Sequence, residues 1–140
     1  MFYLDTSLIV ALITNEAHTP DARGWLSMHL TDELAISLWV TTEVSSALSM
    51  KLRTGQIDAA ERGQAASAYA ALVAGSLLSL PISTTAFTVA ARYSDREDLA
   101  LRGPDALHLA IAAEHGAELC TMDRPLAGAA LALGLPAHLV

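Results

Sequence analysis

The sequence predicts an α/β domain in which helices cover both faces of a central parallel sheet. Short apolar segments, which are typical of buried strands, alternate along the chain with longer helical segments, and this alternation is the pattern of a parallel sheet. The chain has 140 residues, with no internal repeat and no linker rich in proline, glycine or serine. A chain of this length buries enough surface to fold as one unit. We therefore expect a single domain that spans residues 1–140.

The expected strands are the short apolar runs, and the expected helices lie between them. In chain order the expected elements are strand 2–4, helix 6–15, helix 20–30, strand 34–38, helix 40–53, helix 58–78, strand 80–82, a helix from about residue 85, a helix that follows Gly103-Pro104 and ends at His115, strand 118–121, helix 125–133 and strand 137–140. The two central helices are separated at Thr54-Gly55, and the second is rich in alanine, the best helix former. Gly116 is expected to end the late helix, because glycine readily adopts the positive φ of a helix C-terminus.

Composition indicates a compartment and a covered surface. The chain is 53% hydrophobic and only 16% charged, which suggests that a partner or a second copy covers one face. A single cysteine excludes an internal disulfide framework and fits a reducing compartment. No basic segment precedes the first apolar run, and the run at residues 8–13 is too short to span a membrane. We expect a cytoplasmic protein without membrane association.

The formal net charge of −7 and the pI near 5.0 argue against a simple nucleic-acid binder, which usually presents a basic face. An acidic balance is also expected where several carboxylates form one site for divalent cations. The charge therefore leaves both interpretations open until the acids are placed in the fold.

Four acidic residues fall near the expected carboxyl edge of the sheet, where ligands bind in open α/β folds. Asp5 ends the first strand, and Glu43 lies in the first turn of the helix after the second strand. Asp105 lies in the first turn of the helix before the fourth strand, and Asp123 follows that strand. Each acid alone has a structural explanation, as a helix cap or as a partner of the helix dipole. Their convergence instead predicts a site for a hard divalent cation, which relieves the repulsion between carboxylates.

Polar neighbours of the acids have two interpretations each. Thr6, Ser7 and Thr121 are placed to hydrogen-bond the carboxylates around a metal, or else to cap a helix and pack in a strand. His108 lies one helical turn after Asp105. On an otherwise apolar helix we expect it to be a packed, hydrogen-bonded core residue, with a role in the site as the alternative.

Basic residues and the cysteine also have expected places. Arg102 and Arg124 flank two of the acids, where they either contact phosphate oxygens or pair with a nearby acid in solvent. Lys51 and Arg53 end the third helix and suit its C-terminal dipole, with a contact to a nucleic-acid backbone as the alternative. Cys120 lies in an expected buried strand, and we expect it to be inert.

The acidic segments together resemble a known family. The segments YLDTSLIVAL, TTEVSSAL, LRGPDALHLAIAAEHGAEL and TMD follow one another along the chain. In this order they resemble the acidic motifs of PIN-domain ribonucleases, and in particular the VapC-type toxins of VapBC toxin–antitoxin pairs. The resemblance extends over essentially the whole chain, and all four acidic positions are filled. It implies a PIN-like fold whose parallel sheet has the strand order 3-2-1-4-5.

The resemblance also implies a function. It implies a Mg²⁺- or Mn²⁺-dependent endoribonuclease toxin of a type II toxin–antitoxin system, which cleaves structured RNA such as tRNA or rRNA with a metal-activated water. Asp5 and Asp105 would be direct metal ligands, and Glu43 and Asp123 would complete the site directly or through water. The implied partners are the RNA substrate and a VapB-type antitoxin, in a homodimer or a toxin–antitoxin hetero-oligomer. The alternative is a PIN-like binding or regulatory module that acts through antitoxin or RNA binding with little catalysis.

Two other enzyme classes are excluded by single residues. A phosphatase of the haloacid-dehalogenase type needs a second acid two residues after the first, where this chain has Ser7. The only lysine, Lys51, also lies too early in the chain for that class. A dinucleotide-binding fold needs a glycine-rich turn after the first strand, and the segment DTSLIV has no glycine.

Overall fold

A computed structural model, which describes residues 1–140, confirms the predicted α/β architecture. The strands are β1 (Phe2–Leu4), β2 (Leu34–Ser37), β3 (Leu77–Leu80), β4 (Glu118–Thr121) and β5 (Ala137–Leu139). The helices are α1 (Thr6–Ile13), α2 (Thr19–Met28), α3 (Leu38–Arg53), α4 (Ala59–Gly75), α5 (Thr84–Ser94), α6 (Gly103–Glu114) and α7 (Arg124–Ala132), with a short 3-10 helix at Glu97–Leu99. All strand pairs are parallel, and the sheet order is β3-β2-β1-β4-β5, as the resemblance implied.

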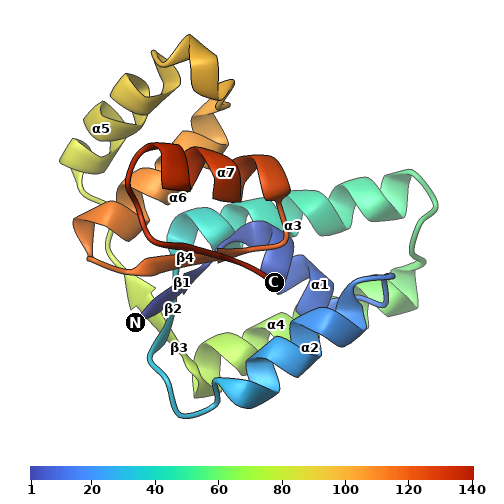
Figure 1. Ribbon diagram of the computed structural model, residues 1–140. Helices are drawn as coiled ribbons and strands as arrows, with labels where there is room; N and C mark the ends of the chain where they lie inside the picture. Colours follow the sequence, from blue (N-terminus) through green and yellow to red (C-terminus); the bar gives the residue numbers. More distant parts are fainter.

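The helices form two layers around the sheet. Figure 1 shows α5, α6 and α7 over one face, while α1, α2 and α4 lie over the other. This division follows from the strand order, because the chain builds outward from β1 to β3 and then crosses to β4 on the other side. Because parallel crossover connections are right-handed, the helices that precede β3 and the helices that follow it lie on opposite faces of the sheet. Helix α3 packs against α1 and α4 and extends away from the end of β2.

The core lies around the two central strands and the helix that follows the first of them. Tyr3, Leu4, Leu119 and Cys120 are fully buried in β1 and β4, which confirms the predicted buried position of the cysteine. In α1, every residue from 8 to 13 is buried, as expected for a helix that is apolar on all sides. The ends of β1 and β4 are thus rigidly supported. None of the helices is long and apolar enough to cross a membrane.

The largest error of the sequence prediction lies between residues 75 and 82. Helix 58–78 was expected, but α4 ends at Gly75, and the strand expected at 80–82 lies instead at Leu77–Leu80. The strand is fixed by parallel pairing with β2, in the register from Leu34–Leu77 to Ser37–Leu80. The local pattern contains no information on this long-range pairing, and leucines continue on both sides of Gly75-Ser76.

Smaller differences concern helix ends. Helix α3 begins at Leu38, two residues before the predicted start, so the strand before it ends at Ser37. Glu43 therefore lies in the second turn of α3 rather than in the first turn, where the sequence placed it. Its position is explained by its side-chain contacts and not by the helix dipole. The 3-10 helix at Glu97–Leu99 was not predicted.

The buried central strands predict how a core substitution acts. Leu119→Ala removes a fully buried side chain in β4 and should lower the free energy of unfolding by about 2–5 kcal/mol. Leu131→Ala, at a residue that is 64% exposed on α7, should change it by less than about 0.5 kcal/mol. Urea denaturation monitored by circular dichroism measures both, and an equal loss in the two variants would contradict this packing.

Candidate functional site

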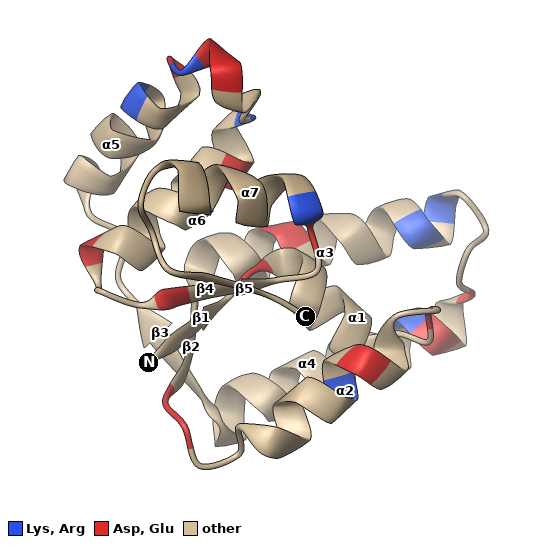
Figure 2. Ribbon diagram, in the orientation of Figure 1, with Lys and Arg blue, Asp and Glu red and all other residues tan.

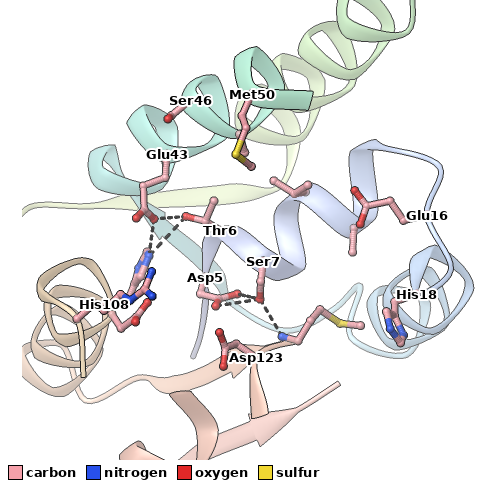
Figure 3. A pocket seen from close by; sticks show the side chains of 16 residues that line it. Asp5, Thr6, Ser7, Glu16, His18, Glu43, Ser46, Met50, His108 and Asp123 are labelled. Atoms are coloured by element: carbon pink, nitrogen blue, oxygen red, sulfur yellow. Dashed lines mark hydrogen bonds and ion pairs between the residues drawn. The ribbon is translucent and has the colours of Figure 1, made fainter. Parts of the chain in front are cut away.

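A cavity of about 690 Å³ lies at the carboxyl edge of the sheet, and all four predicted acids line it. Asp5 follows β1, Glu43 lies on α3, Asp105 lies at the start of α6 and Asp123 follows β4. Figure 3 shows Asp5, Glu43 and Asp123 around the same space. Four carboxylates from distant parts of the chain therefore share one site, because the ends of parallel strands and their neighbouring helices meet at one edge.

Asp5 is the most buried of the four acids, with 3% of its surface exposed. One of its oxygens, Oδ1, accepts the backbone N–H of Leu8 at 3.0 Å, so Asp5 caps α1 as well as lining the cavity. Thr121 Oγ1 donates to Oδ2 at 2.6 Å, and Ser7 Oγ lies 2.8 Å from Oδ1. Burial raises the pKa of the Asp5 carboxyl, and His108 and these hydrogen bonds oppose the rise only in part.

The hydroxyls of Ser7 and Thr121 also join the end of β1 to the end of β4. Ser7 Oγ accepts the N–H of Met122 at 2.9 Å, and Thr121 Oγ1 accepts the N–H of Asp123 at 2.9 Å. Asp123 in turn caps α7 by accepting the N–H of Leu126 at 3.0 Å. Both hydroxyls thus contact the Asp5 carboxylate, as one of the two interpretations predicted, and they fix Asp123 relative to Asp5.

The charge of Asp105 is opposed by burial and by two neighbouring carboxylates. Asp105 lies in the first turn of α6, as predicted, and its carboxylate has no side-chain hydrogen bond. Burial raises its pKa, and the negative charges of Asp123 and Glu43 raise it further, while His108 opposes them. The charged form of Asp105 is therefore disfavoured by its neighbours.

Glu43 is held by two donors on one oxygen. Its Oε2 accepts a hydrogen bond from Thr6 Oγ1 and another from His108 Nε2 at 2.7 Å. Burial alone would raise the pKa of Glu43, but these bonds and the charge of His108 outweigh burial and hold the pKa below its usual value. His108 is 3% exposed, which confirms the predicted core position. The structure adds that this core histidine reaches the cavity (Figure 3).

The donor set of the cavity fits a hard divalent cation, although its side chains are not arranged as a ready-made metal site. No group of three or more His, Cys, Asp and Glu side chains is disposed to hold a metal ion, which agrees with the repulsion among the carboxylates. The acids offer only oxygen donors, which Mg²⁺ and Mn²⁺ prefer. Burial raises the pKa of Asp5, and burial together with the charges of Asp123 and Glu43 raises that of Asp105, so nearby donors offset the carboxylate charges only in part. A bound cation would offset the remainder.

Two arginines lie near the acids, but only one lines the cavity. Arg102 lines it and forms no ion pair with an acid, which leaves its guanidinium available to a ligand. Arg124 lies in the adjoining hollow that Asp123 also lines. Figure 2 shows the acidic segments around the carboxyl edge of the sheet and further basic segments at the far end of α3.

Residues of the loop after α1 complete the wall of the cavity, and sequence reasoning did not single them out. Glu16 and His18 line it, and neither belongs to a recognisable motif. Lys51 Nζ lies 2.5 Å from Glu16 Oε1. This ion pair gives the lysine at the end of α3 a partner and ties that helix to the loop.

Comparisons with known proteins identify the fold. The family model of the PIN domain matches residues 2–130. The structure of VapBC2 from Rickettsia felis, bound to a DNA fragment from their promoter, is similar with a TM-score of 0.72 and 17% identity, over 99% of this chain and 98% of that one. VapC20 from Mycobacterium tuberculosis, a Sarcin-Ricin loop cleaving toxin, is similar with a TM-score of 0.71 and 18% identity. The match covers 92% of this chain and 95% of that one. FitAcB from Neisseria gonorrhoeae is similar with a TM-score of 0.69 and 16% identity, over 98% of this chain and 96% of that one. No curated protein matches the sequence.

The unfavourable environment of the charged Asp105 carboxylate predicts the effect of removing its charge. Because the folded state raises this pKa, stability from Asp105 is lost as pH rises through the titration of the carboxyl. Without metal at pH 7, Asp105→Asn should therefore raise the melting temperature, by a few degrees at most because solvent screens this half-exposed group. The gain should vanish at a pH where the carboxyl is protonated in both states. Asp32→Asn, in an exposed loop, is the control. A lower melting temperature for Asp105→Asn at pH 7 would show that the charge of Asp105 does not destabilise the fold.

The donor set predicts a thermal response to metal. Mg²⁺ or Mn²⁺ should raise the melting temperature, because a ligand that binds only the folded state at about 100 times its Kd adds about 2.7 kcal/mol of stability. A variant with Asp5→Asn, Glu43→Gln, Asp105→Asn and Asp123→Asn should stay folded by circular dichroism and lose the response. An unchanged response in this variant would place the metal elsewhere.

Proposed function

This chain belongs to the PIN domain family, and we propose that it is a Mg²⁺- or Mn²⁺-dependent endoribonuclease toxin of the VapC type. The observation that carries the proposal is the convergence of Asp5, Glu43, Asp105 and Asp123 on one cavity. A structural role explains each acid alone, but it does not explain why four carboxylates share one site at an energetic cost. The similarity to VapC20, a cleaving toxin, and to VapBC2 supports the same assignment.

The chain's own residues have distinct roles in this proposal. Asp5 and Asp105 would hold the cation directly, and Glu43 and Asp123 would complete its surroundings directly or through water. A divalent cation at this place supplies an activated water for attack on a phosphodiester and offsets negative charge on its oxygens. Ser7 and Thr121 keep Asp5 oriented through the hydrogen bonds described above. The products would carry a 5′-phosphate and a 3′-hydroxyl.

RNA binding must overcome the negative charge of the protein. The formal net charge is −7, so the long-range field repels a polyanion. Arg102 lines the cavity without an ion-pair partner, and we assign it the contact with a phosphate next to the cleaved bond. A bound cation would supply the remaining local attraction, so RNA binding and metal binding should depend on each other.

A VapB-type antitoxin is the proposed partner. Large apolar side chains are exposed on two helices that pack against each other, with Leu38, Met50 and Leu52 on α3 and Val73 on α4. An amphipathic antitoxin helix would cover such side chains and would silence the nuclease while bound. The alternative function, a PIN-like binding or regulatory module with little catalysis, uses the same surface, and only an activity measurement separates the two.

The nuclease proposal predicts a specific loss of cleavage. Purified free protein should cleave tRNA or rRNA in Mg²⁺ or Mn²⁺, and EDTA should abolish the reaction. Asp5→Asn and Asp105→Asn should each lower the rate by about 100-fold or more, since groups that only orient metal ligands already account for about 10–100-fold. Asp95→Asn, exposed at the end of α5 and outside the cavity, should cleave like the unmodified protein.

Denaturing gel electrophoresis of end-labelled RNA measures these rates. Equal cleavage by the unmodified protein, Asp5→Asn and Asp105→Asn would assign the activity to a contaminant. RNA binding without cleavage by any of the proteins would favour the binding module.

A further inference from the structure

Behind the cavity, a chain of side-chain hydrogen bonds connects five elements of the fold. Ser37 Oγ at the end of β2 lies 2.8 Å from the hydroxyl of Tyr3 on β1. The same hydroxyl lies 3.0 Å from Nδ1 of His108 on α6. His108 Nε2 lies 2.7 Å from Glu43 Oε2 on α3, and Thr6 of α1 donates to that same oxygen. The imidazole is therefore held at both nitrogens by residues far from it in the sequence.

The proton positions in this chain follow from what each group can donate. Glu43 Oε2 accepts the hydroxyl hydrogen of Thr6 and lies 2.7 Å from His108 Nε2. A carboxylate oxygen accepts hydrogen bonds, so the geometry assigns the proton of the second contact to His108 Nε2. Burial raises the pKa of Tyr3 despite its bond to Ser37, and the phenol keeps its proton. Tyr3 thus fixes the orientation of the ring, and the ring presents an N–H to Glu43.

The two carboxylate oxygens of Glu43 differ in their hydrogen bonds. Both Thr6 and His108 bind Oε2, and no hydrogen bond reaches Oε1. A glutamate with several rotamers, placed near Asp105, would otherwise turn away from the like charge. Holding one oxygen keeps the other available at the cavity.

We propose that His108, oriented by Tyr3, is a positioning residue that holds Glu43 by Oε2 so that Oε1 faces the divalent cation. The inference rests on the proposed metal site and adds a residue to it that bears no carboxylate. It explains why a polar side chain lies in the otherwise apolar, buried face of α6, where residues 106 to 112 are all buried.

Two substitutions of His108 separate its contacts. The amide nitrogen of glutamine reaches about as far as Nε2, so His108→Gln keeps a donor for Glu43. Asparagine reaches only about as far as Nδ1, so His108→Asn keeps a partner for Tyr3 and loses the contact with Glu43. Mn²⁺ affinity, measured by calorimetry or by the EPR signal of free Mn²⁺, should fall about 10–100-fold in His108→Asn. It should be largely retained in His108→Gln and unchanged in His138→Asn, which alters an exposed histidine on β5.

A double-mutant cycle distinguishes positioning from a general structural role. In the Glu43→Gln background, His108→Asn should cause no further loss of Mn²⁺ affinity, since its effect passes through the carboxylate of Glu43. Equal losses with and without Glu43, or an affinity of His108→Asn equal to that of the unmodified protein, would overturn the proposal. If His108→Asn does not fold, Tyr3→Phe decides instead: it keeps the aromatic ring, removes the hydroxyl that orients His108, and should also weaken Mn²⁺ binding.

The proton on Nε2 has its own readout. In ¹⁵N-labelled protein without metal, the imidazole of His108 should show a proton on Nε2 by NMR, and an unprotonated Nε2 would overturn the proposal. The outcomes also remain distinct from those of the nuclease assignment. The expected pattern of Mn²⁺ affinities without RNA cleavage would refute the nuclease and leave the positioning role intact. Absence of Mn²⁺ binding by the unmodified protein would overturn the positioning role.

Discussion

Repulsion among carboxylates at one edge of the sheet is the constraint on which the arrangement of this protein depends. Parallel strands end at the same edge, so residues that follow β1 and β4 and residues on the adjacent helices are brought together whatever their charge. The chain partly offsets this charge with hydroxyls, two helix N-termini and one imidazole. The offset is unequal, since the pKa of Glu43 is lowered while those of Asp5 and Asp105 are raised. The fold thus retains an unfavourable negative charge that a bound cation would relieve.

The parts of the fold that local sequence determines could be predicted. Short apolar runs marked the strands, and Gly116 ended a helix as expected, with a φ of 61°. The bounds of α4 and β3 were predicted wrongly, because leucines continue on both sides of Gly75-Ser76 and pairing with β2 determines where the strand lies. Local pattern determines where an element is favoured, and long-range hydrogen bonds determine where it begins.

The candidate site shows the same division. The four acids could be located from their positions after strands and at helix starts, and the structural alternatives for Asp5 and Asp123 proved compatible with a site, since both residues also cap helices. The role of His108 could not be derived in this way. Its partners Tyr3 and Glu43 lie 105 and 65 residues away in the sequence, and nothing in an apolar helix indicates which partner a histidine finds.

The direction of the last strand has a practical consequence. The N–H of Val140 bonds to the carbonyl of Thr121 at 3.0 Å, and Leu139 and Val140 line a hollow together with Asp123. β5 runs parallel to β1, so residues fused after Val140 would leave the sheet beside the acids, while residues fused before Met1 would leave from the opposite edge. A polyhistidine tag at the C-terminus would place competing imidazole ligands at the mouth of the site. Metal titrations of this chain are therefore best made with the tag at the N-terminus.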